Sequence, residues 1–146
     1  MDLTELTTYQ ALVYRSRANR TVKTQVEKVL HEYNLTMAQW AVLGFIKDAG
    51  KRGIRISDLA ARIDTSLAFI TNSVNTLEKK GIVYRTGHER DNRAKLVYIA
   101  NDYRHKVSSI EQRLRRQLCE WYGKVLTQAE LETQIEVFRK LAQTND

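Results

Sequence analysis

Proline is absent from the 146-residue chain, and the six glycines are few enough to serve mainly as turn markers. Because proline and glycine interrupt helices, a chain with so few breaks is expected to be mostly helical. The longest uninterrupted apolar stretch lies around residues 41–46. A helix that crosses a bilayer needs ~20 such residues. The sequence therefore predicts a helical protein without a membrane span.

Cysteine occurs only at Cys119, and histidine only at His31, His88 and His105. A single cysteine excludes an intramolecular disulfide, which fits a reducing compartment. The histidines lack metal-ligand spacing, so no metal site or cofactor is expected. Glycine-rich phosphate loops, Ser-His-Asp sets and paired carboxylates are also missing, and we expect no enzymatic activity. The start of the chain does not resemble a signal peptide, so a cytoplasmic protein is expected.

Acidic residues are outnumbered, 17 against 24 lysines and arginines, and the net charge is +7. The excess is local. Residues 79–95 contain six basic and two acidic side chains, whereas residues 127–146 contain two basic and four acidic ones. A concentrated positive charge favours a polyanionic partner, of which nucleic acid is the commonest.

Apolar residues spaced three and four apart predict six helical segments, four before and two after one β-prone region. The first segment is residues 3–33. Thr36 with Gln39 forms a capping box that opens the second, and Ser57 and Ser66 are the expected caps of two short helices at residues 57–64 and 66–80. Gly81 follows the last of these, where a left-handed residue is preferred.

Two β-prone runs, residues 82–85 and 95–99, flank a polar tip and predict a hairpin. Asn101 or Asp102 is then expected to cap a long helix that reaches about Val125. Thr127 with Glu130 forms a second capping box. It opens a final helix with an inward apolar stripe that consists of Leu131, Ile135, Phe138 and Leu141.

The centre of the chain has the order of a helix-turn-helix followed by a hairpin. In that arrangement the second helix enters the major groove of DNA, and its polar side chains contact base edges. The candidates on the second helix are Ser66, Thr71, Asn72 and Asn75. The alternative for this helix is an ordinary solvated polar face.

The predicted hairpin carries most of the local positive charge. Guanidinium groups suit phosphates and narrow minor grooves, and an acidic neighbour can brace an arginine. The wing candidates are Arg85, Arg90, Asp91, Arg93 and Lys95, with Asp91 as the brace of Arg93 or Arg85. A charged, solvated loop is the alternative, but it is less expected directly after a helix-turn-helix.

Several of these segments together resemble the MarR family of regulators. The resemblance rests on motifs that follow one another in the family's order: LTMAQWAVL (35–43), DLA (58–60), IT (70–71), LEKKGIVYR (77–85) and DNR (91–93). The chain departs from the pattern at Ala100, where the family usually has threonine. The resemblance implies a mostly α (α+β) winged helix-turn-helix with N- and C-terminal dimerisation helices, divided as residues 1–34, 35–100 and 101–146.

The resemblance also implies function. It predicts a homodimer that binds double-stranded DNA at pseudo-palindromic operators, as a repressor relieved by a small aromatic effector. Dimerisation has a separate argument, because the apolar stripes outside the centre have no other segment of the chain to cover them. A low-specificity architectural DNA-binding protein is the alternative, and a small-molecule carrier or enzyme is a third hypothesis.

Tyr14, Tyr33 and Trp40 are the candidates for an effector cavity, which rests on the resemblance alone. Aromatic residues at helical spacing are more often ordinary core residues. Cys119 is expected to be an inert helical residue, with redox sensing as the alternative.

Overall fold

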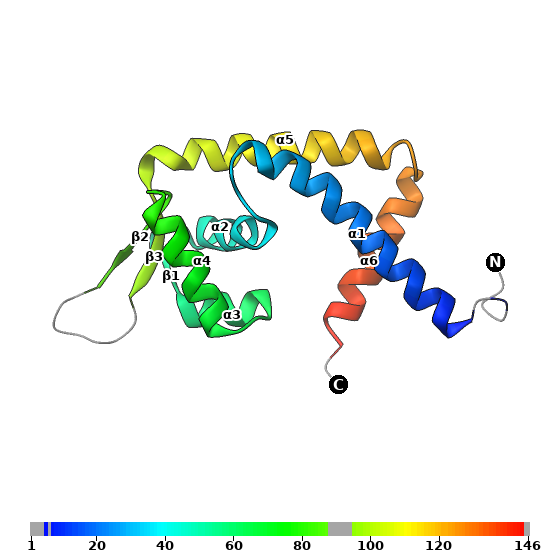
Figure 1. Ribbon diagram of the computed structural model, residues 1–146, viewed down its shortest axis with the longest axis horizontal. Coiled ribbons are helices and arrows are strands. Elements are labelled where there is room, and N and C mark those ends of the chain that lie inside the picture. The colour runs from blue at the N-terminus through cyan, green and yellow to red at the C-terminus, as the bar shows by residue number, and fades with distance from the viewer. Residues whose placement is uncertain (1–4, 6, 88–94, 145–146) are drawn as a thin grey trace. The chain divides into compact units, whose positions relative to one another are not determined.

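The computed structural model describes residues 5, 7–87 and 95–144 (Figure 1). Its helices are α1 (Thr8–Glu32), α2 (Met37–Ala49), α3 (Ile56–Ile63), α4 (Leu67–Lys79), α5 (Arg104–Tyr122) and α6 (Gln128–Ala142). Its strands are β1 (Ile54–Arg55), β2 (Val83–Thr86) and β3 (Leu96–Ile99), and its 3₁₀ turns are η1 (Gly50–Arg52) and η2 (Asn101–Tyr103). The predicted mostly helical fold with one hairpin is confirmed.

The chain divides into two compact units. Unit 1 comprises residues 1–26 and 113–146, and unit 2 comprises residues 27–112. The sequence predicts a different division, into a DNA-binding segment (35–100) and two dimerisation segments (1–34 and 101–146). This functional division stays a prediction.

The core of unit 2 is formed by α2, α3, α4 and the small sheet. Leu43, Leu59, Ile70 and Val97 are completely buried in it. Burial of a side chain of this size stabilises a fold by about 1.5–3 kcal/mol. The end of α1 and the start of α5 add Leu30 and other buried residues to the same core, so unit 2 is well packed.

The sheet of unit 2 is antiparallel with the strand order β1-β3-β2. Tyr84 and Tyr98 face each other across β2 and β3, and their rings stack with centroids 5.4 Å apart. Gly53 lies against the same ring, since a Cβ at this position would be 2.6 Å from Tyr98. Strand β1 was not expected, because its two residues are too few to show an alternating pattern.

Three of the expected helix caps are confirmed. The capping boxes of Thr36 with Gln39 and of Thr127 with Glu130 are both formed, and Ser66 accepts from the backbone of Phe69. The backbone N–H and the hydroxyl of Thr127 lower the pKa of the Glu130 carboxyl.

Two expected caps are wrong. Ser57 lies inside the first turn of α3, which begins one residue earlier because extended Arg55 at the end of β1 precedes it directly. Asn101 and Asp102 lie in η2, where Tyr103 N–H donates to the carbonyl of Ala100 at 2.9 Å. The long helix α5 therefore begins later than expected, at Arg104, and ends at Tyr122.

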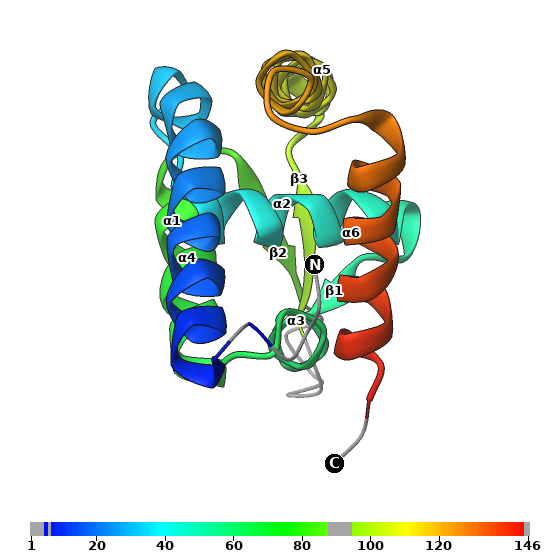
Figure 2. The same cartoon turned by 90° about the vertical axis from the view of Figure 1, so that its right-hand side faces the viewer.

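Unit 1 buries little apolar surface within one chain. Helices α1 and α6 overlap in Figure 1 but stand apart in Figure 2. Among the described residues of unit 1, Leu114 alone belongs to the buried apolar core. The stripe expected to face inward on α6 is open instead, with Ile135, Phe138 and Leu141 more than half exposed. The α6 expectation is therefore wrong for a single chain.

Gly81 gives a test of the C-terminal end of α4. It has φ +73°, and the N–H groups of Gly81 and Ile82 bond to the carbonyls of Glu78 and Leu77, the two bonds of a Schellman motif. A Cβ at this position meets no atom within 4 Å, so Gly81→Ala changes only the backbone preference. We expect it to lower the free energy of unfolding by about 1–2 kcal/mol, measured by urea denaturation.

Gly44 is the matched control for Gly81. It lies inside α2 and also has open space where a Cβ would be. Gly44→Ala is expected to raise the free energy of unfolding by about 0.5–1 kcal/mol. Equal effects at the two glycines would show that the left-handed conformation is not the cause.

Candidate nucleic-acid interface

Helices α3 and α4 are joined by a short turn whose backbone is fixed by local hydrogen bonds. Asp64 ends α3 in the left-handed conformation, with φ 57°. Thr65 N–H donates to the carbonyl of Ala60 at 3.0 Å, and Ser66 Oγ accepts from the backbone N–H of Phe69 at 3.2 Å. The start of α4 is therefore held at a defined place relative to α3, as a helix-turn-helix requires.

The inner face of α4 anchors the helix in unit 2. Ile70, Val74 and Leu77 are each 0% exposed. Because these residues recur every three or four positions, one side of α4 is fixed in the core and the opposite side faces outward. The anchors predicted from the sequence are confirmed.

The predicted base-contacting residues of α4 differ in how much of their hydrogen-bonding capacity is used within the protein. Ser66 caps the helix, and the hydroxyl of Thr71 donates to the carbonyl of Leu67 at 2.8 Å. The side-chain oxygen of Asn75 accepts from Arg85. Asn72 is exposed, and its amide has no hydrogen-bond partner among the described residues.

Two apolar side chains at the start of α4 were missed by the sequence reasoning. Leu67 is 56% exposed and Phe69 is 46% exposed. The available signal for Phe69 was its phase on the helix, since it does not follow the three-and-four spacing of Ile70, Val74 and Leu77. Leu67 does continue that spacing, three residues before Ile70, and its exposure at the start of the helix had no such signal. The outer surface of α4 is thus partly apolar and partly polar.

Arg85 of β2 joins the hairpin to α4. Its guanidinium donates to the Asn75 side chain, and its Nε lies 2.9 Å from Glu78 Oε2, an ion-pair contact without the alignment of a hydrogen bond. The Arg85 side chain is only 20% exposed. Two residues expected to face DNA therefore contact each other, and Glu78 is a partner that the sequence reasoning did not identify.

Other basic residues lie close in sequence to these elements and are exposed. Lys79, Lys80 and Lys95 are exposed, and Lys80 Nζ donates to the carbonyl of Asn34 at 2.7 Å. The predicted wing residues Arg90, Asp91 and Arg93 lie outside the described residues, so their roles stay predictions, including the bracing by Asp91.

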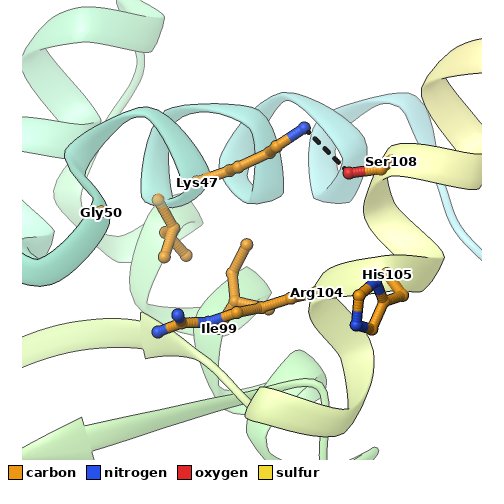
Figure 3. Close-up of a pocket in the computed structure, with 7 residues that line it drawn as sticks. Lys47, Gly50, Ile99, Arg104, His105 and Ser108 are labelled. Carbon is orange, nitrogen blue, oxygen red and sulfur yellow. Dashed lines mark hydrogen bonds between the residues drawn. The ribbon is translucent and has the colours of Figure 1, made fainter.

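Unit 2 also has a hollow of about 340 Å³ between α2, β3 and the start of α5 (Figure 3). Lys47, Arg104 and His105 give it a basic rim, and Lys47 Nζ donates to Ser108 Oγ at 3.3 Å. Ile46 and Ile99 supply apolar surface, and Gly50 completes the lining. The lining includes no acidic residue, which favours an anion with an apolar part.

The three aromatic candidates for an effector cavity do not line this hollow. Tyr14 belongs to unit 1 and is 58% exposed, whereas Tyr33 and Trp40 are half-buried residues of unit 2. Burial, and after it the charge of nearby Tyr33, raises the pKa of the Tyr103 phenol. The aromatic cavity stays a prediction.

Other kinds of site find no support in residues 5, 7–87 and 95–144. No cluster of three or more His, Cys, Asp or Glu side chains there is arranged to bind a metal ion. None of the helices in these ranges combines the length and apolar character of a membrane span. Cys119 is an exposed free cysteine on α5.

The fold and the α3–α4 surface define a winged helix-turn-helix protein, and comparison with known proteins agrees. Residues 33–94 match the model of the MarR family. A curated relative, the transcriptional activatory protein BadR of Rhodopseudomonas palustris, is 34% identical over 110 residues, which are 75% of this chain and 61% of BadR. The matched part therefore spans less than two thirds of that relative.

Solved structures share the fold over nearly the whole chain. A MarR family transcriptional regulator from a Rhodococcus species has a TM-score of 0.81 at 20% identity, with 94% of this chain and 96% of that chain covered. A MarR family regulator of Streptomyces coelicolor in complex with DNA has a TM-score of 0.80 at 19% identity, with 94% and 88% covered. The chain thus matches the MarR family over residues 33–94, and its fold is that of solved MarR family regulators.

The contacts that Arg85 makes within the protein predict how its substitution affects the binding of duplex DNA, which is expected from the sequence. Since its guanidinium is held by Asn75 and Glu78, Arg85→Ala should weaken binding by releasing the hairpin from α4. The slope of log K against log salt should not change, because no phosphate contact is lost. Binding is measured by fluorescence anisotropy at several salt concentrations.

Lys95→Ala is the matched control, since Lys95 is exposed beside the same hairpin. It should reduce the salt slope by about 0.9, the value for one phosphate contact. A similar reduction for Arg85→Ala would show that Arg85 contacts phosphate itself and would refute its positioning role.

Proposed function

We propose that the protein is a dimeric, sequence-specific DNA-binding transcriptional regulator. The observation that carries this proposal is the outer face of α4, where Asn72 is exposed and unpaired among the described residues while the inner face is locked in the core. An asparagine amide can pair with N6 and N7 of adenine in the major groove. The anchored helix presents this amide at a fixed position, as base recognition requires.

The hairpin completes the proposed interface. Arg85 holds β2 against α4 through Asn75 and Glu78, so this strand and the recognition helix form one surface. In the proposal, α4 lies in the major groove and the wing reaches the neighbouring minor groove. Arg93 is its minor-groove arginine, supported by Asp91, and Arg90 and Lys95 contact phosphates.

A second copy of the chain is the proposed partner of unit 1. Tyr9, Leu12 and Tyr14 on α1 and Ile135 and Phe138 on α6 are all more than half exposed in one chain. Apolar surface of this extent is costly in water, and two-fold pairing removes it. A symmetric dimer also places two recognition helices about 34–36 Å apart, which suits a pseudo-palindromic operator.

Control by a small molecule is the regulatory part of the proposal. The basic, partly apolar hollow of unit 2 suits an organic anion, and Tyr14, Tyr33 and Trp40 remain candidates for an aromatic effector. A ligand would act by favouring a dimer shape with a different spacing of recognition helices. The sequence predicts repression, whereas the relative BadR is named as an activator. A regulator of this kind works beside the chromosome, which places it in the cytoplasm.

Arg93→Ala tests the wing together with sequence specificity. Loss of a minor-groove guanidinium should weaken binding to a selected operator by about 1–3 kcal/mol while the far-ultraviolet circular dichroism stays unchanged. The operator is obtained by selection from random duplexes, and random duplex is the competitor. Equal affinity for operator and random DNA would favour the architectural alternative, and an unaffected Arg93→Ala variant would remove the wing from the interface.

Phe138→Glu tests the homodimer. A carboxylate on this apolar surface would have to be desolvated at the interface, so the variant should sediment as a monomer and bind the operator more weakly. Thr133→Glu is the control, because Thr133 lies on the polar side of the same helix. It should remain dimeric. A wild-type chain that is monomeric at micromolar concentration would refute the dimer.

A further inference from the structure

The outward side of α4 has apolar side chains beside Asn72, whose amide has no hydrogen-bond partner among the described residues. Ala68, Phe69 and Asn72 are all exposed, and Phe69 retains 46% of its surface in contact with solvent. Residues three and four apart are neighbours on a helix surface, so both Ala68 and Phe69 adjoin Asn72. The three side chains form one continuous surface, which we call the outer triad.

Hydrogen bonds within unit 2 engage several polar side chains of α4. The outer triad is therefore the main part of α4 that can contact base edges. The Ser66 hydroxyl is used in the helix cap, the Thr71 hydroxyl donates to Leu67, and Asn75 accepts from Arg85. Further along α4, Thr76 donates to the carbonyl of Asn72 at 3.0 Å. The hydroxyl-rich appearance of the helix in the sequence therefore overstates its capacity for polar base contacts.

An apolar side chain beside an amide matches the major-groove edge of A·T pairs. Thymine alone among the four bases presents a C5-methyl group there, and alanine and phenylalanine side chains contact it. An asparagine beside them can form two hydrogen bonds to adenine. A G·C pair offers no methyl group to Phe69.

We propose that Phe69, with Ala68, reads a thymine C5-methyl group in each half of the operator, beside an adenine read by Asn72. This inference rests on the proposed function and specifies its base preference. Leu67 is also exposed, but it lies on a different side of the helix from Asn72 and serves as the comparison position.

The test removes single methyl groups from DNA. An operator is selected from random duplexes with the full-length protein, and each thymine is then replaced by deoxyuridine, which lacks only the C5-methyl group. Affinity is measured by fluorescence anisotropy at one salt concentration. At one thymine per half-site we expect about fourfold weaker binding, the factor for one methyl-sized apolar contact.

Protein variants assign that effect to a residue. Phe69→Ala should bind the thymine and deoxyuridine operators equally, whereas Phe69→Leu should keep part of the difference. Asn72→Ala and Leu67→Ala should retain the full methyl effect, Asn72→Ala at lower overall affinity. Because Phe69 is exposed, circular dichroism and thermal melting should show that its variants fold normally.

The possible outcomes separate this inference from the proposed function. If the protein binds its operator specifically and no deoxyuridine replacement weakens this binding, the inference is overturned but the proposed function is not. The same holds if Phe69→Ala remains as sensitive to the methyl group as the wild type. A protein that binds no duplex at low salt would overturn both.

Discussion

The burial of one side of α4 is the constraint on which the rest of unit 2 depends. Ile70, Val74 and Leu77 have no exposed surface, so the rotation of α4 about its axis is set by the core. Ser66 fixes where the helix starts, and the Schellman motif at Gly81 fixes where it ends. The outward direction of Asn72 and Phe69 follows from this packing, and it needs no contact with a ligand to be established.

Periodicity and capping chemistry made most of the fold predictable. Both capping boxes, the Ser66 cap, the position of Gly81 and the hairpin all depend on interactions between residues close in sequence. The errors arose where distant segments decide the local structure. Strand β1 exists because Ile54 and Arg55 pair with β3, and this pairing places the start of α3 before Ser57.

The candidate site was predictable as a region but not in its connections. Composition and order pointed to α4 and the hairpin, yet the sequence does not reveal that Arg85 lies between Asn75 and Glu78. That arrangement depends on how β2 packs against α4. The exposure of Phe69 was not predicted either, because the sequence analysis considered only the polar side chains on the outer face of this helix.

In the proposed dimer, the open apolar face of unit 1 makes the stability of the protein depend on its concentration. When a second copy covers Ile135 and Phe138, the free energy gained on pairing adds to that of folding, and its size grows with the concentration of chains. Newly made chains at low abundance would have a folded unit 2 but an uncovered unit 1. Such chains are the ones that proteases and aggregation would remove first, so a minimum level of expression would be needed before complete molecules accumulate.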